Sequence, residues 1–160
     1  MILVTVGMQL GFDRLIAAMD ALAPELEGPV IAQTGKGTYR PRHMEAREKL
    51  APAEFETLVE RASLIVAHAG IGTVVTAARH AKPIVLMPRR ASLGEHRNDH
   101  QLATARQLAG RPGILVAEDE SELRPRIAEG LTGQDCSRLA SPTAVQLHAA
   151  LAAFIENRQP

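Results

Sequence analysis

Residues 64–87 read LIVAHAGIGTVVTAARHAKPIVLM, and this stretch decides the fold. Residues 64–67 and 84–87 are short apolar runs with the length and composition of buried strands. Residues 72–80 between them are predicted to form a helix, which ends before Pro83. Two buried strands joined by a helix predict a parallel strand pair with a right-handed crossover.

The same alternation of strands and helices continues on both sides of this unit. Residues 36–47 are predicted to form a loop. For residues 44–50 two alternatives remain open, because residue propensity favours a helix and the alternation of elements favours a short strand. The remaining predicted elements are strands at residues 2–6, 30–33 and 114–116 and helices at residues 12–26, 53–62, 98–109, 121–131 (capped by Ser121, with Glu122 in its first turn) and 143–157.

These elements predict an α/β fold, a Rossmann-like doubly wound parallel sheet of about six strands. We expect one domain over residues 1–160, with the helix 143–157 packing back on the sheet. The alternative is that part of the apolar face of this helix contacts a partner subunit. Ligands of such a sheet lie beyond the carboxyl ends of its strands, so the segments that follow the strands are the candidate site.

Composition narrows the function classes. The chain has 160 residues, of which 46% are hydrophobic and 22% charged, as in ordinary globular proteins. Eighteen basic and eighteen acidic residues cancel, and aromatic residues make up 2%, which argues against a nucleic-acid binder. A single cysteine, Cys136, excludes an internal disulfide and a cysteine-cluster metal site. The chain opens without a charged leader and has no apolar run of membrane-spanning length, so we expect a cytoplasmic protein.

Two glycine-containing segments each follow a strand and precede a helix. Residues 6–11, VGMQLG, let backbone N–H groups approach a phosphate at a helix N-terminus, although a tight strand–helix turn explains them equally well. Residues 68–73, HAGIGT, add a hydroxyl at Thr73 and an imidazole at His68 that can donate to a phosphate oxygen. The alternative for His68 is a structural histidine at the end of a strand.

Polar side chains crowd a third segment, residues 88–101, which also lies between a strand and a helix. Its sequence PRRASLGEHRNDHQ is dense in hydrogen-bonding groups that suit a polyhydroxylated or anionic ligand, and a solvated loop is the alternative. A fourth, basic stretch at residues 36–43 is either solvated or in contact with a partner or a lipid phosphate. The carboxyl edge of a parallel sheet brings the first three segments together.

These motifs carry a specific resemblance. The stretches VTVGMQ (4–9), FDRLI (12–16), HAGIGT (68–73) and GEHRNDHQ (94–101) resemble the family 28 glycosyltransferase C-terminal domain over about residues 1–130. Within that family the chain is most similar to small catalytic subunits of two-component exopolysaccharide transferases of the glucuronosyltransferase type. It is similar, more distantly, to the soluble subunit of the dolichol-linked N-acetylglucosaminyltransferase. The resemblance implies the donor-binding, C-terminal half of a GT-B enzyme.

The resemblance also assigns roles to residues. Two departures are Met8, where relatives commonly have a threonine, and Thr76, where many have a glutamate that binds ribose. Uracil is expected against the backbone of residues 50–58. Glu95 and His96 have the chemistry of a general base, and Arg89, Arg90 or Arg97 can pair with a glucuronate carboxylate. The implied donor-binding residues are Gly7, Met8, Gln9, His68, Gly70, Gly72, Thr73, Thr76, Arg89, Arg90, His100 and Gln101.

The implied reaction is sugar transfer from a UDP-sugar to a lipid-diphosphate-linked acceptor in surface polysaccharide synthesis. GT-B enzymes usually need no divalent ion, and the sequence has no Asp-x-Asp to hold one, so we expect no metal and no cofactor. The resemblance further implies a membrane-anchored, acceptor-binding partner subunit that recruits this chain to the inner face of the membrane. The alternative is a nucleotide-binding or regulatory module without catalysis, and a small hydrolase is a third, weaker interpretation.

Overall fold

The computed structural model describes residues 1–132, which form a six-stranded, all-parallel sheet. The predicted helix at 143–157 lies outside the described residues. The sheet order is β3-β2-β1-β4-β5-β6, so the chain reverses its direction of winding between β1 and β4. The predicted Rossmann-like, doubly wound α/β fold is confirmed. The strands are β1 (Ile2–Thr5), β2 (Val30–Gln33), β3 (Glu45–Arg47), β4 (Leu64–His68), β5 (Ile84–Met87) and β6 (Ile114–Val116).

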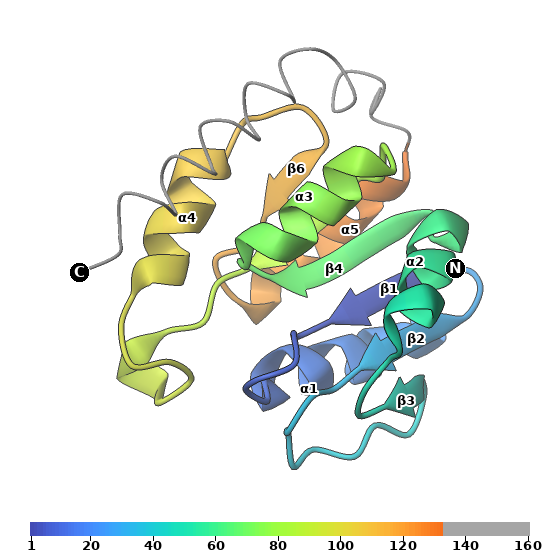
Figure 1. The fold of residues 1–160 in the computed structure, drawn as a ribbon, viewed down its shortest axis with the longest axis horizontal. Coiled ribbons are helices and arrows are strands. Elements are labelled where there is room, and N and C mark those ends of the chain that lie inside the picture. The colour runs from blue at the N-terminus through green and yellow to red at the C-terminus, as the bar shows by residue number, and fades with distance from the viewer. Residues whose placement is uncertain (133–160) are drawn as a thin grey trace.

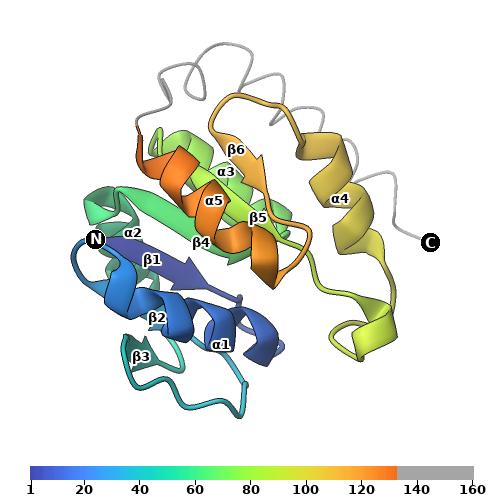
Figure 2. The ribbon, with the colours of Figure 1, turned by 180° about the vertical axis from the view of Figure 1, so that it is seen from behind.

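Helices cover both faces of the sheet (Figures 1 and 2). Helices α2, α3 and α4 lie on the face toward the viewer in Figure 1, and α1 and α5 lie on the face toward the viewer in Figure 2. Their bounds are α1 (Asp13–Leu22), α2 (Pro52–Arg61), α3 (Ile71–Arg79), α4 (His100–Leu108) and α5 (Glu120–Leu131), with 3-10 turns η1 (Ala23–Glu25) after α1 and η2 (Ala91–Leu93) after β5.

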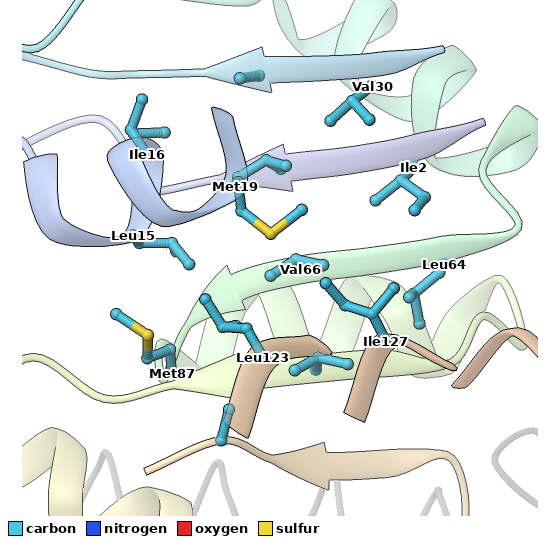
Figure 3. Packing of buried hydrophobic residues seen from close by; sticks show 14 of the residues in the cluster. Ile2, Leu15, Ile16, Met19, Val30, Leu64, Val66, Met87, Leu123 and Ile127 are labelled. Atoms are coloured by element: carbon cyan, nitrogen blue, oxygen red, sulfur yellow. The ribbon is translucent and has the colours of Figure 1, made fainter. Parts of the chain in front are cut away.

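The strands alternate their side chains between two cores. In β1, Ile2 and Val4 point into the core under α1 and α5, whereas Leu3 points into the core under α2, α3 and α4. Figure 3 shows the first core, where Met19 of α1 and Ile127 of α5 meet the strand residues. Because both faces of the central strands are buried, β1, β4 and β5 are almost continuously apolar in sequence.

The structure decides one open alternative and corrects two local predictions. Residues 45–47 form the edge strand β3, as the alternation of elements favoured, because pairing with β2 outweighs helix propensity in a three-residue segment. The loop predicted over residues 36–47 therefore ends before this strand. The cap of α5 is Asp119 and not Ser121: the Asp119 carboxylate accepts from the Ser121 N–H at 2.9 Å. Ser121 lies inside the first turn, where its hydroxyl donates to the same carboxylate.

Candidate functional site

The three predicted segments meet at one edge of the sheet. They follow β1, β4 and β5, which are adjacent strands in the order of the sheet. The reversal between β1 and β4 leaves a crevice beyond their carboxyl ends, the usual place for a ligand in an open α/β sheet. Two cavities open there.

The two cavities differ in chemistry. The larger, of about 450 Å³, has mainly apolar walls, and the smaller, of about 310 Å³, is more polar. Both are lined by Gly7, Met8 and His68, so the two cavities adjoin at these three residues. The larger is also lined by Thr5, Gln33, Leu50, Pro52, Phe55, Gly70, Gly72, Thr73 and Thr76, and the smaller by Val6, Gln9, Leu10, Arg89, His96 and Gln101.

Most of the predicted site residues gather at these cavities. Arg90, Glu95 and His100 do not line either of the two. Residues 50–58, where uracil is expected, contribute Leu50, Pro52 and Phe55 to the larger cavity. The predicted residues that do line a cavity are Gly7, Met8, Gln9, His68, Gly70, Gly72, Thr73, Thr76, Arg89, His96 and Gln101.

His68, at the end of β4, is uncharged at neutral pH. Burial lowers the pKa of His68 to about 4, and the nearby cation of Arg89 acts in the same direction. The ring lies against both glycine segments: a Cβ added at Gly7 would meet its Cε1 at 3.0 Å, and one added at Gly70 would collide with its Nε2. His68 is therefore a neutral imidazole at the junction of the two cavities, and the backbone of Thr5 is a hydrogen-bonding partner of its ring.

The glycines of the site serve different purposes. Gly7 has a φ of +79°, a left-handed conformation that favours glycine, and Gly70 has no room for a side chain beside His68. Gly72, in the first turn of α3, is different, because an added Cβ would have nothing within 4 Å. Its empty side faces the larger cavity, which Thr76 also lines while its hydroxyl donates to the Gly72 carbonyl at 3.0 Å. No packing contact therefore explains the glycine at position 72.

Two buried polar residues that sequence reasoning missed support the first glycine segment. Thr5 and Gln33 end the neighbouring strands β1 and β2, and each is almost fully buried. The Thr5 hydroxyl donates to Gln33 Oε1 at 2.5 Å, and Gln33 Nε2 donates to the Gly7 carbonyl at 3.1 Å. A polar residue at the end of an otherwise apolar strand was the available signal, because buried amides need partners.

Arg89 also holds the first glycine segment in place by hydrogen bonds. Its side chain is only 2% exposed, and the guanidinium donates to the carbonyls of Val6 at 2.7 Å, of Leu10 at 3.0 Å, and of Gly11. It lies over the Phe12 ring, 4.8 Å from the ring centre. Arg89 thus reaches the polar cavity with most of its donors already bonded, whereas Arg97 is exposed and lines neither cavity.

Glu95 is held in an ion pair with Arg14 of α1. Arg14 Nε and Nη2 donate to its two carboxylate oxygens at 2.6 and 2.8 Å, and the Arg90 N–H donates to one of them at 2.9 Å. Arg90 itself donates to the Glu118 carbonyl at 2.8 Å. This pairing connects the 88–95 loop to α1. The three hydrogen bonds stabilise the ionised carboxylate and so make Glu95 a weaker general base.

His96 and Gln101 present polar groups to the smaller cavity. Nδ1 of His96 lies 3.1 Å from Asn98 Oδ1, an acceptor that also receives the His100 N–H at 3.3 Å. The proton of a neutral His96 is therefore assigned to Nδ1, which leaves Nε2 as an acceptor. Gln101 accepts the Arg89 N–H at 3.1 Å through Oε1, so its amide NH₂ remains for a ligand. His100 is exposed at the start of α4.

The basic stretch 36–43 is fastened to α1 by two aspartates. Asp13 accepts from the N–H and the hydroxyl of Thr38, and Asp20 accepts from the N–H groups of Arg42 and His43. Burial alone would raise the pKa of Asp20, but these hydrogen bonds lower it below its usual value. The stretch is ordered by local contacts, so its placement does not require a partner or a lipid phosphate.

Residues 1–132 lack two further classes of site. No three histidine, cysteine, aspartate or glutamate side chains there gather closely enough to hold a metal ion. Among the same residues, no helix has the length and hydropathy needed to cross a membrane.

The chain has a fold similar to parts of several solved structures, among them named glycosyltransferases. The kitacinnamycin glycotransferase superposes with a TM-score of 0.65 at 19% identity, covering 99% of this chain and 43% of that one. SsfS6 of Streptomyces sp. SF2575, solved with thymidine diphosphate, gives 0.62 at 20% identity, over 90% of this chain and 37% of that one. ALG13 gives 0.58 at 14% identity, over 83% of this chain and 86% of that one.

The chain therefore spans about two fifths of the first two of these enzymes and most of ALG13. No curated protein matches it by sequence comparison. A family model does match: the glycosyltransferase family 28 C-terminal domain aligns with residues 1–138. With its parallel sheet and its crevice at the switch point, the chain belongs to the family of glycosyltransferase family 28 C-terminal domains.

Proposed function

We propose that this chain binds the nucleotide-sugar donor, a UDP-sugar, in a glycosyl transfer reaction. The observation that carries the proposal is the pair of cavities of unlike polarity that join at Gly7, Met8 and His68. The apolar cavity fits a nucleoside, with the base against Leu50, Pro52 and Phe55 and the ribose near Thr76. The polar cavity fits a sugar, within reach of Gln101 and His96.

With the nucleoside in the apolar cavity and the sugar in the polar one, the diphosphate between them lies where the two cavities adjoin. The N–H of Gly7 and the N–H groups of residues 71–73 in the first turn of α3 supply donors there, beside the uncharged His68. The leaving group of the transfer is UDP, so negative charge develops on these oxygens as the glycosidic bond to the donor breaks. Donors already aimed at that charge stabilise the transition state without a metal ion.

His96 is the general base candidate that the geometry favours. It lines the polar cavity, and its bond to Asn98 leaves Nε2 available to take the proton from the acceptor hydroxyl. Glu95 has the same chemistry but is bonded to Arg14. We therefore give His96 the catalytic role and Glu95 the role of holding the loop.

The acceptor and the partner complete the proposal. We propose a lipid-diphosphate-linked acceptor in surface polysaccharide synthesis, with glucuronic acid as the candidate sugar. A membrane-anchored subunit would supply the acceptor site and recruit this chain to the inner face of the membrane from the cytoplasm. The chain's similarity to a part of larger two-domain transferases supports a site completed by a second domain.

A transfer assay in native membranes tests the proposal. Membranes from cells with and without this chain are incubated with radiolabelled UDP-glucuronate or UDP-glucose, and label in the lipid fraction is counted. The proposal expects labelled lipid only where the chain is present, and a loss of at least a hundredfold when the His96→Gln variant replaces it. Equal labelling without the chain would contradict a catalytic role and favour a regulatory nucleotide-binding module. Co-purification with a membrane protein tests the partner separately.

A further inference from the structure

Residues 6–11 join β1 to α1, and most of their carbonyl groups accept hydrogen bonds from buried side chains. The carbonyls of Val6, Leu10 and Gly11 accept from the guanidinium of Arg89. The carbonyl of Gly7 accepts from the amide of Gln33. Two buried side chains from β2 and from the end of β5 thus hold four carbonyls of a six-residue segment.

The N–H groups of this segment are left for a ligand. In a trans peptide the N–H points away from the carbonyl of the preceding residue, and the described chain has no cis bond. The N–H groups of Gly7, Met8 and Gly11 therefore point away from the side chains that hold those carbonyls. Within residues 1–132, none of the N–H groups of residues 7–11 donates to another protein group. Clustered free N–H groups are the backbone chemistry that binds phosphate.

Arg89 has no carboxylate to pair with at this position. Among the described residues its hydrogen-bonding partners are the three carbonyls, and Glu95 acts on it only as a more distant charge. The carbonyl oxygens and the Phe12 ring stabilise the buried cation. The guanidinium in turn holds these carbonyls in place and adds a buried positive charge next to residues 6–11. A contact of Arg89 with the sugar itself is not needed for either effect.

We propose that Arg89, with Gln33, is a positioning residue for the donor diphosphate. By holding the carbonyls of residues 6–11 inward, it makes the segment present N–H groups to the diphosphate. This inference rests on the proposed function, because it assigns the diphosphate to the junction of the two cavities. It predicts that losing Arg89 weakens binding of phosphates and spares binding of the nucleoside.

The test compares UDP with uridine in NMR titrations. Arg89→Met is expected to weaken UDP binding at least tenfold while uridine binding stays within twofold. Arg14→Met is the matched control, because Arg14 also lies over Phe12, at 5.3 Å, but donates to none of the carbonyls of residues 6–11. In this control the ratio of UDP to uridine affinity should not change. If Arg89→Met weakened the binding of UDP and of uridine equally, or left UDP binding unchanged, the proposal would be overturned.

A second measurement uses the wild-type chain and so does not depend on a folded variant. Inorganic pyrophosphate should shift the amide resonances of Gly7 and Met8, which line both cavities. No shift at these amides would overturn the positioning role. If pyrophosphate shifts them but UDP binds no tighter than pyrophosphate, the positioning role stands and the proposed UDP-sugar function fails.

Discussion

Arg14 and Glu95 form a two-bond ion pair between α1 and the loop that follows β5, with Nε to Oε1 at 2.6 Å and Nη2 to Oε2 at 2.8 Å. Both side chains are largely buried, with exposures of 14% and 12%. Arg14 also donates to the Pro88 carbonyl and to Glu120 of α5. One guanidinium therefore connects α1, the loop after β5 and α5. Glu95 belongs to this network and lines neither cavity, whereas its neighbour His96 lines the polar cavity, so the two residues have different roles.

The first prediction separates these roles. Glu95→Gln should lower the free energy of unfolding by about 2–3 kcal/mol, because it removes the more buried of the two carboxylates that pair with Arg14. His96→Gln should change that free energy by less than about 0.5 kcal/mol and should lower the transfer rate by at least a hundredfold. Urea denaturation and the membrane assay measure the two effects. A stable Glu95→Gln variant with no transfer activity would return the catalytic role to Glu95.

The second prediction concerns Gly72. An added methyl group meets no atom within 4 Å, so Gly72→Ala should fold and should gain about 0.5 kcal/mol from higher helix propensity. The methyl would occupy the side of the first turn of α3 that lines the apolar cavity, so UDP affinity should fall at least tenfold. Gly70→Ala is the contrasting variant and should lose stability, since its Cβ collides with His68. Wild-type UDP affinity in Gly72→Ala would show that no ligand approaches this turn.

The third prediction follows from the buried imidazole of His68. Its pKa is about 4 in the folded protein, against about 6.5 in the unfolded chain. The unfolded state therefore binds more protons between these values, and stability falls as the pH falls from about 6.5 to 4. The loss attributable to this residue should be about 3 kcal/mol.

Urea denaturation of wild type and His68→Gln at pH 7 and pH 4 measures that loss. The stability difference between the two proteins should move in favour of the variant on acidification, because glutamine takes up no proton. A difference that is independent of pH would show that His68 titrates normally in the folded protein.

The alternation of elements, the doubly wound parallel sheet and the edge that carries the site could be predicted from sequence, because they follow from local patterns and the rules for connecting parallel strands. Apolar runs such as residues 84–87 match β5 in full. The edge strand β3 could not be predicted in the same way. All three of its residues are exposed, so its sequence has no apolar pattern, and its conformation comes from pairing with β2.

Side-chain roles within the site were harder to predict than its location. Arg89 and Glu95 lie in a polar loop whose sequence suggests a ligand contact, but their partners come from residues about 80 positions away. Gln33 looks like the last residue of an ordinary strand, and only the fold brings its amide to the Gly7 carbonyl. Long-range pairing of this kind has no local signal in the sequence.

The fourth prediction concerns the buried pair of Thr5 and Gln33. Gln33→Leu should lower the free energy of unfolding by about 1–3 kcal/mol, because the Thr5 hydroxyl and the Gly7 carbonyl lose their partner. Adding Thr5→Val should recover part of that loss, since the buried hydroxyl is then removed too. A double-mutant cycle by urea denaturation measures the coupling. Additive effects would show that the two side chains do not depend on each other.

The central claim is that the joined cavities hold a uridine diphosphate moiety, and ligand titration calorimetry of the wild-type chain tests it most directly. UDP, uridine, NADH and FMN are compared under the same conditions. UDP should bind more tightly than uridine, because the groups at the junction of the two cavities add contacts to the diphosphate. NADH and FMN should bind more weakly than UDP. Tighter binding of NADH or FMN than of UDP would contradict the central claim.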